Sequence, residues 1–212
     1  EKLNNWADFI IGSCDYFKKF YKTDISNISV NIESNLPIGI GLSSSAATCV
    51  SMIRALSNYF EINLDQSTMV KIAHRIENDF VGVGGGVMDQ FVSVYGETDK
   101  ALFLNTKNND YKLIPLFDDY NFQIIDSGIK RILSDSAFND RKKMCNQSAE
   151  KMGLKYLCDK DKIDKKDKEL LSNSEFKVSR HVIEENIRSK KGSEALLNND
   201  PKLFGELMTQ SH

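Results

Sequence analysis

The chain has 212 residues, with 28 Lys and Arg against 30 Asp and Glu, and a formal net charge of −2. A chain of this length can bury one substantial core or two modest ones, so an enzyme domain is possible. The balanced and scattered charges give no basic face of the kind that a phosphate backbone requires, which argues against nucleic acid as a partner.

The cysteines and the apolar runs indicate the compartment. Cys14, Cys49, Cys145 and Cys158 are widely spaced and form no Cys-x-x-Cys pair, as expected of thiols kept reduced in a cytosol rather than of a zinc site. No apolar run approaches the ~18 residues that span a bilayer, and the N-terminus lacks a signal-peptide pattern. We therefore expect a cytoplasmic protein without a membrane partner. Because the chain starts at Glu1 directly with a helical pattern, we also expect it to be part of something longer.

The first part of the chain predicts helices around a glycine-rich loop. Residues 4–21 carry apolar residues at three- and four-residue steps, which indicates a helix with one buried stripe. Residues 25–32 favour a strand, because apolar and polar residues alternate from Ile28 onward. A Gly- and Pro-rich loop at 36–42 leads into a helix that reaches Phe60, and Asp65 can cap a further helix that ends near Glu77. The stripe of the first helix comprises Trp6, Phe9, Ile10, Cys14, Phe17 and Phe20.

The rest of the chain mixes strands and helices. The glycines of residues 81–87 exclude a helix and indicate a loop shaped for close backbone approach. Residues 101–104, 111–116 and 120–125 predict three short strands in an antiparallel meander. Helices are predicted at 134–152, at 176–187 and from Asp200 to Met208, and the Lys- and Asp-rich residues 158–169 predict a solvated face or a surface loop. The fold class that follows is α+β.

Residues 36–47 carry the clearest chemical signal. They read Leu-Pro-Ile-Gly-Ile-Gly-Leu-Ser-Ser-Ser-Ala-Ala, which combines glycines that admit an anion, three hydroxyls and the start of a helix. A helix N-terminus favours negative charge by about 0.3–1 kcal/mol, so these are the parts of a phosphate cradle. No Gly-Lys-Ser/Thr appears, which excludes a Walker loop. The alternative is an ordinary strand-to-helix turn with serine caps, although the whole segment is more specific than a bare Gly-x-Gly.

This segment closely resembles the central motif of the family of galactokinases, homoserine, mevalonate and phosphomevalonate kinases. Its triple serine is similar to that of galactokinases and their nearest sugar-kinase relatives, and residues 6–7, 80–83, 88–91, 179–182 and 207–212 are similar to galactokinase segments in the same order. The resemblance implies the two-layer α+β fold of that family, incomplete here. Residues 1–116 would form part of a ribosomal S5 domain 2-like lobe with the ATP loop, and residues 117–212 part of a ferredoxin-like lobe.

The resemblance also implies a nucleotide site with ATP and Mg²⁺ as cofactors. Ser45 and Glu77 would hold Mg²⁺, which prefers a few hard oxygen ligands and keeps water and phosphate in the rest of its shell. The residues that would bind the ATP phosphates are Gly39, Ile40, Gly41, Leu42, Ser43, Ser44 and Ser45.

The same resemblance implies a sugar site. Asp89 would face the attacking hydroxyl as general base, a role typically worth ~10²–10⁴ in rate, and Gly86 would let the main chain approach the sugar. Phe138 stands where galactokinases usually carry a tyrosine that hydrogen-bonds the sugar, so one bond of about 0.5–1.5 kcal/mol is lost or met by water.

The function expected from these residues is phosphorylation of galactose at its anomeric hydroxyl, giving galactose 1-phosphate as the first step of galactose catabolism. A kinase for a related sugar such as N-acetylgalactosamine, a non-catalytic regulator that binds galactose and ATP, and a purely structural module remain alternatives. The family's upstream Gly-Arg-x-Asn-x-x-Gly-Glu-His-x-Asp-Tyr motif and its downstream glycine-rich motif are absent from these 212 residues. We therefore expect the remainder of the kinase chain as a partner, and little or no activity from this polypeptide alone.

Overall fold

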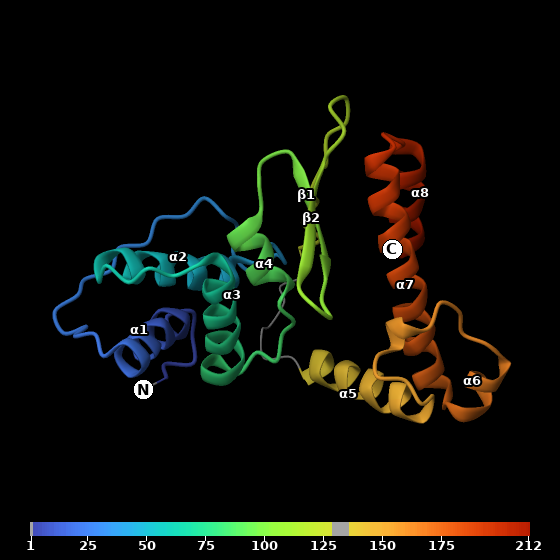
Figure 1. Ribbon diagram of the computed structural model, residues 1–212, viewed down its shortest axis with the longest axis horizontal. Coiled ribbons are helices and arrows are strands. Elements are labelled where there is room, and N and C mark those ends of the chain that lie inside the picture. The colour runs from blue at the N-terminus through green and yellow to red at the C-terminus, as the bar shows by residue number, and fades with distance from the viewer. Residues whose placement is uncertain (1, 129–135) are drawn as a thin grey trace. The chain divides into compact units, whose positions relative to one another are not determined.

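The computed structural model describes residues 2–128 and 136–212, with side chains from residue 139 onward in the second range (Figure 1). The described chain forms two compact units. Unit 1 contains the residues up to Thr98, Leu104–Lys112 and residues 124–128, and unit 2 contains Asp99–Phe103, Leu113–Gln123 and the residues from 136 to His212. The lobe boundary predicted between residues 116 and 117 stays a prediction.

Unit 1 is a cluster of helices around one apolar core. It comprises α1 (Asp8–Tyr21), α2 (Ser44–Tyr59), α3 (Gln66–Arg75), the π-helix η1 (Ile76–Val81) and α4 (Met88–Tyr95). The helices bury apolar stripes against one another, which is how amphipathic helices gain most of their stability. The core consists of Phe9, Phe17, Cys49, Val50, Met52, Ile53, Leu56, Met69, Val70, Ile72, Ala73, Ile76, Phe91 and Val94.

The start of α1 differs from the sequence prediction. The buried Asp8 carboxylate accepts the backbone N–H groups of Leu3 at 2.7 Å and Asn4 at 2.9 Å, which holds the preceding residues in a turn. Trp6 precedes the helix and is 65% exposed, and Phe20 is 49% exposed. The predicted buried stripe is thus right for its middle and wrong at its two ends.

A close helix contact explains where the stripe lies. A Cβ atom added at Gly12 would sit 2.8 Å from both Ile76 Cγ2 and Phe80 Cδ1. Such a distance is far inside van der Waals contact, so α1 can approach η1 only because this position has no side chain.

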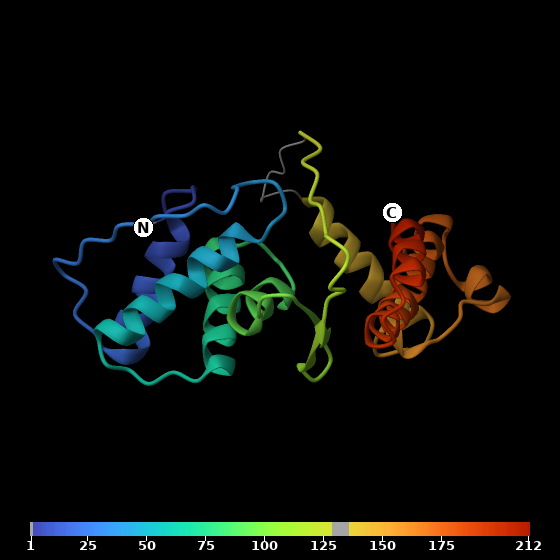
Figure 2. The same cartoon turned by 90° about the horizontal axis from the view of Figure 1, so that it is seen from above.

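Two predicted strands are wrong. Residues 25–32 and 120–125 have no regular structure, because the only sheet among the described residues is the hairpin of β1 (Lys100–Asn105) and β2 (Asp110–Pro115), and neither segment pairs with it. Figures 1 and 2 both show the α1–α2 connection as a long trace along one side of these helices. Without a ladder partner much of the alternating pattern stays in solvent, with Val30 43% and Ile124 67% exposed, although Ile28 packs partly against the core of unit 1. The hairpin itself confirms the other two predicted strands.

Unit 2 is built on a long helix. It comprises α5 (Ser136–Lys151), the 3-10 turn η2 (Leu157–Asp159), α6 (Lys165–Leu170), α7 (Asn173–Leu197) and α8 (Pro201–Ser211). The helix α7 starts earlier than predicted because Ser172 and Glu175 form a capping box. One cluster packs Ala149, Leu157 and Ile183, and another packs Ile114, Phe117 and Leu196. No helix in the described ranges is long and apolar enough to cross a bilayer.

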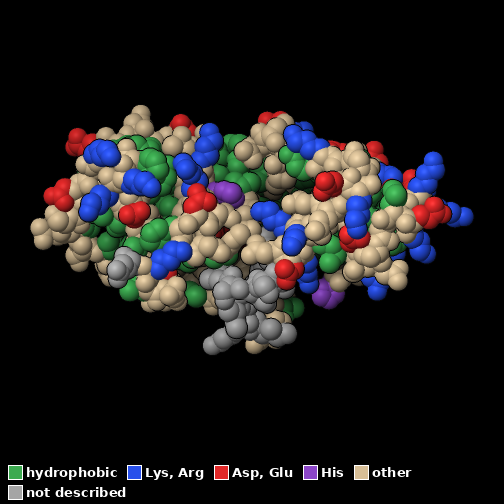
Figure 3. Space-filling view, turned by 90° about the horizontal axis from the view of Figure 1, so that it is seen from below, with side chains coloured by type: hydrophobic (Ala, Val, Ile, Leu, Met, Phe, Trp, Pro, Cys, Tyr) green, Lys and Arg blue, Asp and Glu red, His purple; other side chains and the backbone are tan. Residues whose placement is uncertain are grey.

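Of the two alternatives for the charged segment 158–169, the structure favours a solvated face, since α6 forms part of the segment and most of its side chains are exposed. Asp164 caps α6 by accepting the N–H groups of Lys166 and Asp167, and the buried Asp167 pairs with Lys160 at 2.6 Å. The capping box organises a run that composition alone describes as solvated. Elsewhere acidic and basic side chains are interspersed, with apolar side chains visible between them on the face in Figure 3.

A substitution at Gly12 tests the α1–η1 contact. In an open helix position Gly→Ala stabilises by roughly 0.5–1 kcal/mol, but at Gly12 the added methyl group overlaps two side chains. We expect Gly12→Ala to lower the free energy of unfolding by about 1–3 kcal/mol. Gly205→Ala in α8, where an added Cβ meets nothing within 4 Å, is the matched control and should stabilise. Urea unfolding followed by circular dichroism measures both, and a Gly12→Ala protein at least as stable as the parent would contradict the contact.

The start of α7 should depend on pH. The Lys151 ammonium at 2.7 Å and the Ser172 N–H at 2.9 Å lower the pKa of Glu175 from 4.5 to about 2. Because the folded-state pKa is the lower one, the ionised carboxylate stabilises the fold above pH 4.5, and this contribution is lost as the pH falls towards 2.

Glu175→Gln should therefore lower the melting temperature at pH 7, and the difference from the parent should shrink steadily between pH 5 and pH 2. Thermal unfolding at several pH values measures it. Glu184→Gln is the control, since its pair with Arg180 is 3.8 Å long and exposed and should contribute little. A difference for Glu175→Gln that does not change with pH would contradict the argument.

Candidate functional site

The residues from Gly39 to Ser45, called the serine loop below, form an open turn at the start of α2. Gly39 (φ 80°), Gly41 (φ 85°) and Ser43 (φ 56°) all have left-handed backbone conformations, and the glycines have open space where a Cβ would be. Alternating conformations of this kind turn successive N–H groups towards a common centre, an arrangement that binds anions. The first N–H groups of α2 add unpaired donors at the same place.

The alternative of a turn with serine caps receives no support from the geometry. The residue before α2 is Ser43, and its side chain makes no capping hydrogen bond. The Ser45 hydroxyl instead donates to Glu77 Oε1 at 3.0 Å. Neither of these two hydroxyls caps the N-terminus of α2.

Glu77 is placed by the π-helix. The α3 helix widens after Arg75, and the carbonyl oxygen of Glu77 accepts the N–H groups of Gly82 at 2.9 Å and Val83 at 3.0 Å. The side chain is only 5% exposed. Its Oε1 accepts from Ser45, and its Oε2 accepts from Gln90 Nε2. The first turns of α2 and α4 thus meet at one carboxylate.

The surroundings of Glu77 disfavour its negative charge. Burial is the largest cause that raises its pKa, and the negative charge of Asp89 raises it further, whereas the hydrogen bonds from Ser45 and Gln90 lower it. A buried carboxylate within reach of a second carboxylate is an arrangement that a bound cation would neutralise, and such perturbed groups gather at functional sites.

Asp89 lies in the first turn of α4 and is half-buried. The loop before it contains Gly82 (φ 93°) and the exposed Gly86, where an added Cβ would meet nothing within 4 Å. Ser45, Glu77 and Asp89 are therefore gathered in unit 1, with Gly86 three residues before Asp89. Phe138 belongs to α5 of unit 2, and its side chain lies outside the described residues.

Three further residues of this site were missed by the sequence reasoning. Gln90 contacts Glu77 directly. Cys49 lies one helical turn after Ser45, and its Sγ is 3.8 Å from the hydroxyl of Ser13. Burial raises the pKa of Cys49 to about 12, and the negative charge of Glu77 adds to this effect, so the thiol stays neutral behind the carboxylate. The spacing of four residues between Ser45 and Cys49 is the one signal that places them on one helix face.

The oxygen pair of Ser45 and Glu77 fits magnesium. Neighbouring ligands of an octahedral Mg²⁺ at ~2.0–2.1 Å lie about 2.9 Å apart, and the two oxygens here are 3.0 Å apart. The described residues contain no group of three or more His, Cys, Asp or Glu that could hold a metal ion by itself. Mg²⁺ characteristically takes one or two protein ligands together with phosphate and water, which this pair would allow.

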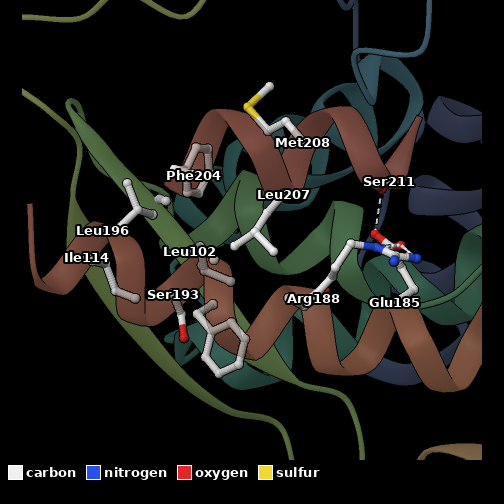
Figure 4. A pocket seen from close by; sticks show the side chains of 14 residues that line it. Leu102, Ile114, Glu185, Arg188, Ser193, Leu196, Phe204, Leu207, Met208 and Ser211 are labelled. Atoms are coloured by element: carbon white, nitrogen blue, oxygen red, sulfur yellow. Dashed lines mark hydrogen bonds and ion pairs between the residues drawn. The ribbon is translucent and has the colours of Figure 1, made fainter. Parts of the chain in front are cut away.

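Unit 2 has an apolar groove with a volume of about 260 Å³ between α7, α8 and the hairpin (Figure 4). At its polar end Glu185 accepts from Arg188 at 2.8 Å and from Ser211 at 2.6 Å. None of the predicted site residues whose side chains are described lines it. The apolar lining comprises Ala101, Leu102, Phe103, Ile114, Leu196, Phe204, Leu207 and Met208.

Comparison with known proteins identifies a domain family that this part of the chain resembles. Residues 8–97 match the family model described as the GHMP kinases N terminal domain. This part of the chain, which holds the serine loop, Glu77 and Asp89, is similar to that domain.

The particular relatives are galactokinases. The chain is 40% identical over 214 residues to the galactokinase of Thermotoga petrophila and 34% identical over 227 residues to that of Clostridium perfringens. Both alignments cover 100% of this chain. They cover 60% of the Thermotoga protein and 57% of the Clostridium protein. The crystal structure of Lactococcus lactis galactokinase complexed with galactose matches the fold with a TM-score of 0.81 at 23% identity, over 100% of this chain and 56% of that one. The chain therefore spans less than two thirds of the galactokinases that it matches. The resemblance and the kinase fold predicted from the sequence are confirmed.

Proposed function

We propose that this chain is the central part of a galactokinase, which transfers the terminal phosphoryl group of ATP to the anomeric hydroxyl of galactose. One observation carries the proposal. The Ser45–Glu77 hydrogen bond, 3.0 Å long, joins the serine loop to the Glu77 carboxylate. Gln90, which lies on the same helix α4 as Asp89, donates to the other oxygen of that carboxylate. The similarity to galactokinases along the whole chain supports the choice of substrate.

The serine loop would bind the ATP phosphates. Its left-handed glycines leave the main chain accessible, and the N-terminus of α2 adds oriented N–H donors and the positive end of the helix dipole. Phosphoryl transfer depends mainly on alignment and charge neutralisation, and a nest of main-chain donors supplies both without moving.

Ser45 and Glu77 would hold Mg²⁺ beside these phosphates. When bound, the cation neutralises charge on the phosphate oxygens. It would also relieve the electrostatic cost of the buried Glu77 carboxylate, whose pKa is raised by burial and by the charge of Asp89. The hydroxyl and the carboxylate already lie next to each other, so little rearrangement is needed.

Asp89 would act on the sugar. A sugar hydroxyl is a weak nucleophile, and a carboxylate within hydrogen-bond reach can take its proton as the phosphoryl group transfers. Asp89 is half-buried and lies three residues after the exposed Gly86, where the backbone is open to close approach. Its place beside Glu77 favours a catalyst over a sugar-binding regulator, which has no use for a base.

A kinase for a related sugar is the second candidate. Phe138 stands where a tyrosine hydroxyl would contact galactose by resemblance. The loss of that hydroxyl changes what the site can bond, and a sugar with a different substituent, such as N-acetylgalactosamine, would be affected differently. Comparison of kcat/KM for the two sugars with the full-length kinase decides between them.

Substitution of Asp89 tests the reaction. In the full-length kinase we expect Asp89→Ala to lower kcat by at least ~10²–10⁴, since the base is lost, while galactose binding measured by calorimetry is largely retained. Asp79→Ala is the control, because that carboxylate is exposed and pairs weakly with Arg75. Near-normal turnover by Asp89→Ala would show that this aspartate is not the base.

Substitution of Ser45 tests the nucleotide site. Ser45→Ala removes one candidate ligand oxygen and the hydrogen bond to Glu77, so the Mg²⁺ and ATP concentrations for half-maximal rate should rise by roughly tenfold or more. Ser51→Ala, an exposed change on the same helix, should leave both unchanged. An unaltered Mg²⁺ and ATP dependence in Ser45→Ala would rule out the ligand role.

A further inference from the structure

Gln90 is a buried polar residue for which the proposed reaction supplies no role. Its side chain is 1% exposed, and its Nε2 donates to Glu77 Oε2. Its own Oε1 is buried without a hydrogen-bond partner among the described residues. A buried amide whose oxygen has no hydrogen-bond partner costs stability, so its presence calls for a reason.

The two oxygens of Glu77 have different partners from different helices. Oε1 faces Ser45 in the first turn of α2, and Oε2 faces Gln90 in the first turn of α4. Because both positions are occupied by donors, the carboxylate cannot rotate without breaking a buried hydrogen bond. Gln90 thereby keeps Oε1 directed at the serine loop.

The position of Gln90 in α4 extends this effect to the proposed base. Successive residues of an α-helix point about 100° apart, so the turn that directs Gln90 into the core directs Asp89 to its half-buried place beside it. The apolar packing of Phe91 and Val94 holds α4 in the core of unit 1. The Gln90 hydrogen bond links the helix of the base to the Glu77 carboxylate.

We propose that Gln90 is a positioning residue for Mg²⁺ binding, which acts by fixing the orientation of the Glu77 carboxylate. This inference rests on the proposed function. An amide suits the role because it donates to Oε2 without adding charge, whereas a carboxylate would repel Glu77 and an apolar side chain would leave Oε2 unpaired. Partners of metal ligands typically affect metal affinity by 10–100-fold.

The test uses the full-length kinase with two variants. Gln90→Met keeps the side-chain volume and removes the donor, and Gln90→Asn keeps the amide but shortens its reach by one methylene. For both we expect the Mg²⁺ concentration for half-maximal rate to rise by about 10-fold or more, with kcat at saturating Mg²⁺ changed much less. Binding of Mn²⁺ to the enzyme–ADP complex, followed by electron paramagnetic resonance, should weaken by a similar factor.

Ser57→Ala is the matched control. It removes a buried hydrogen bond to Ile62 in the same unit, about three helical turns from Ser45. It should lower the melting temperature and leave Mg²⁺ and Mn²⁺ binding unchanged.

If both Gln90 variants bind Mn²⁺ and respond to Mg²⁺ like the parent, even with a lower melting temperature, the positioning role is overturned and Gln90 is only structural. If the parent enzyme itself releases no ADP with galactose and ATP, the proposed function fails instead, so the two failures are distinguishable.

Discussion

The rest of the site depends on one buried carboxylate. Glu77 is 5% exposed, and it accepts hydrogen bonds from Ser45 on α2 and Gln90 on α4. Two helix N-termini, one following the serine loop and one carrying Asp89, are held together through this side chain. Because hydrogen bonds to an ionised group are stronger and more directional than neutral ones, this carboxylate links groups that lie far apart in the sequence, in addition to the apolar packing between α2 and α4.

This arrangement is costly to the folded protein. Burial raises the pKa of Glu77, and Asp89 adds a second negative charge nearby. Both effects disfavour the ionised state that a metal ligand needs. The residues around Glu77 in unit 1 are tightly packed, since Gly12 lets α1 approach Ile76 and Phe80 of η1. A site of this kind keeps electrostatic strain that a bound cation can relieve, so function and stability make opposed demands on it.

The sequence predicted the parts of this protein that local physics decides. Helix periodicity located the helices, and the glycines of the serine loop correctly indicated an open turn because left-handed conformations require such residues. The strand predictions at 25–32 and 120–125 were wrong. Alternation shows which face of a strand each side chain would occupy, but it cannot show whether a neighbouring strand exists to form hydrogen bonds. Gln90 was missed for a similar reason. Its importance depends on which way α4 is turned, and that is set by packing between segments distant in the chain.

The π-helix gives the site an unusual dependence on chain length. Between Ile76 and Val81 the backbone holds one residue more per turn than an α-helix would, with Gly82 N–H bonded back to the Glu77 carbonyl. Loss of a single residue from this stretch would let the ladder tighten into an ordinary helix, and everything after it would rotate by about 100°. A one-residue deletion here would therefore swing the following loop and Asp89 away from Ser45. The number of residues between Ile76 and Val81 is thus as much a requirement of this site as the Glu77 carboxylate itself.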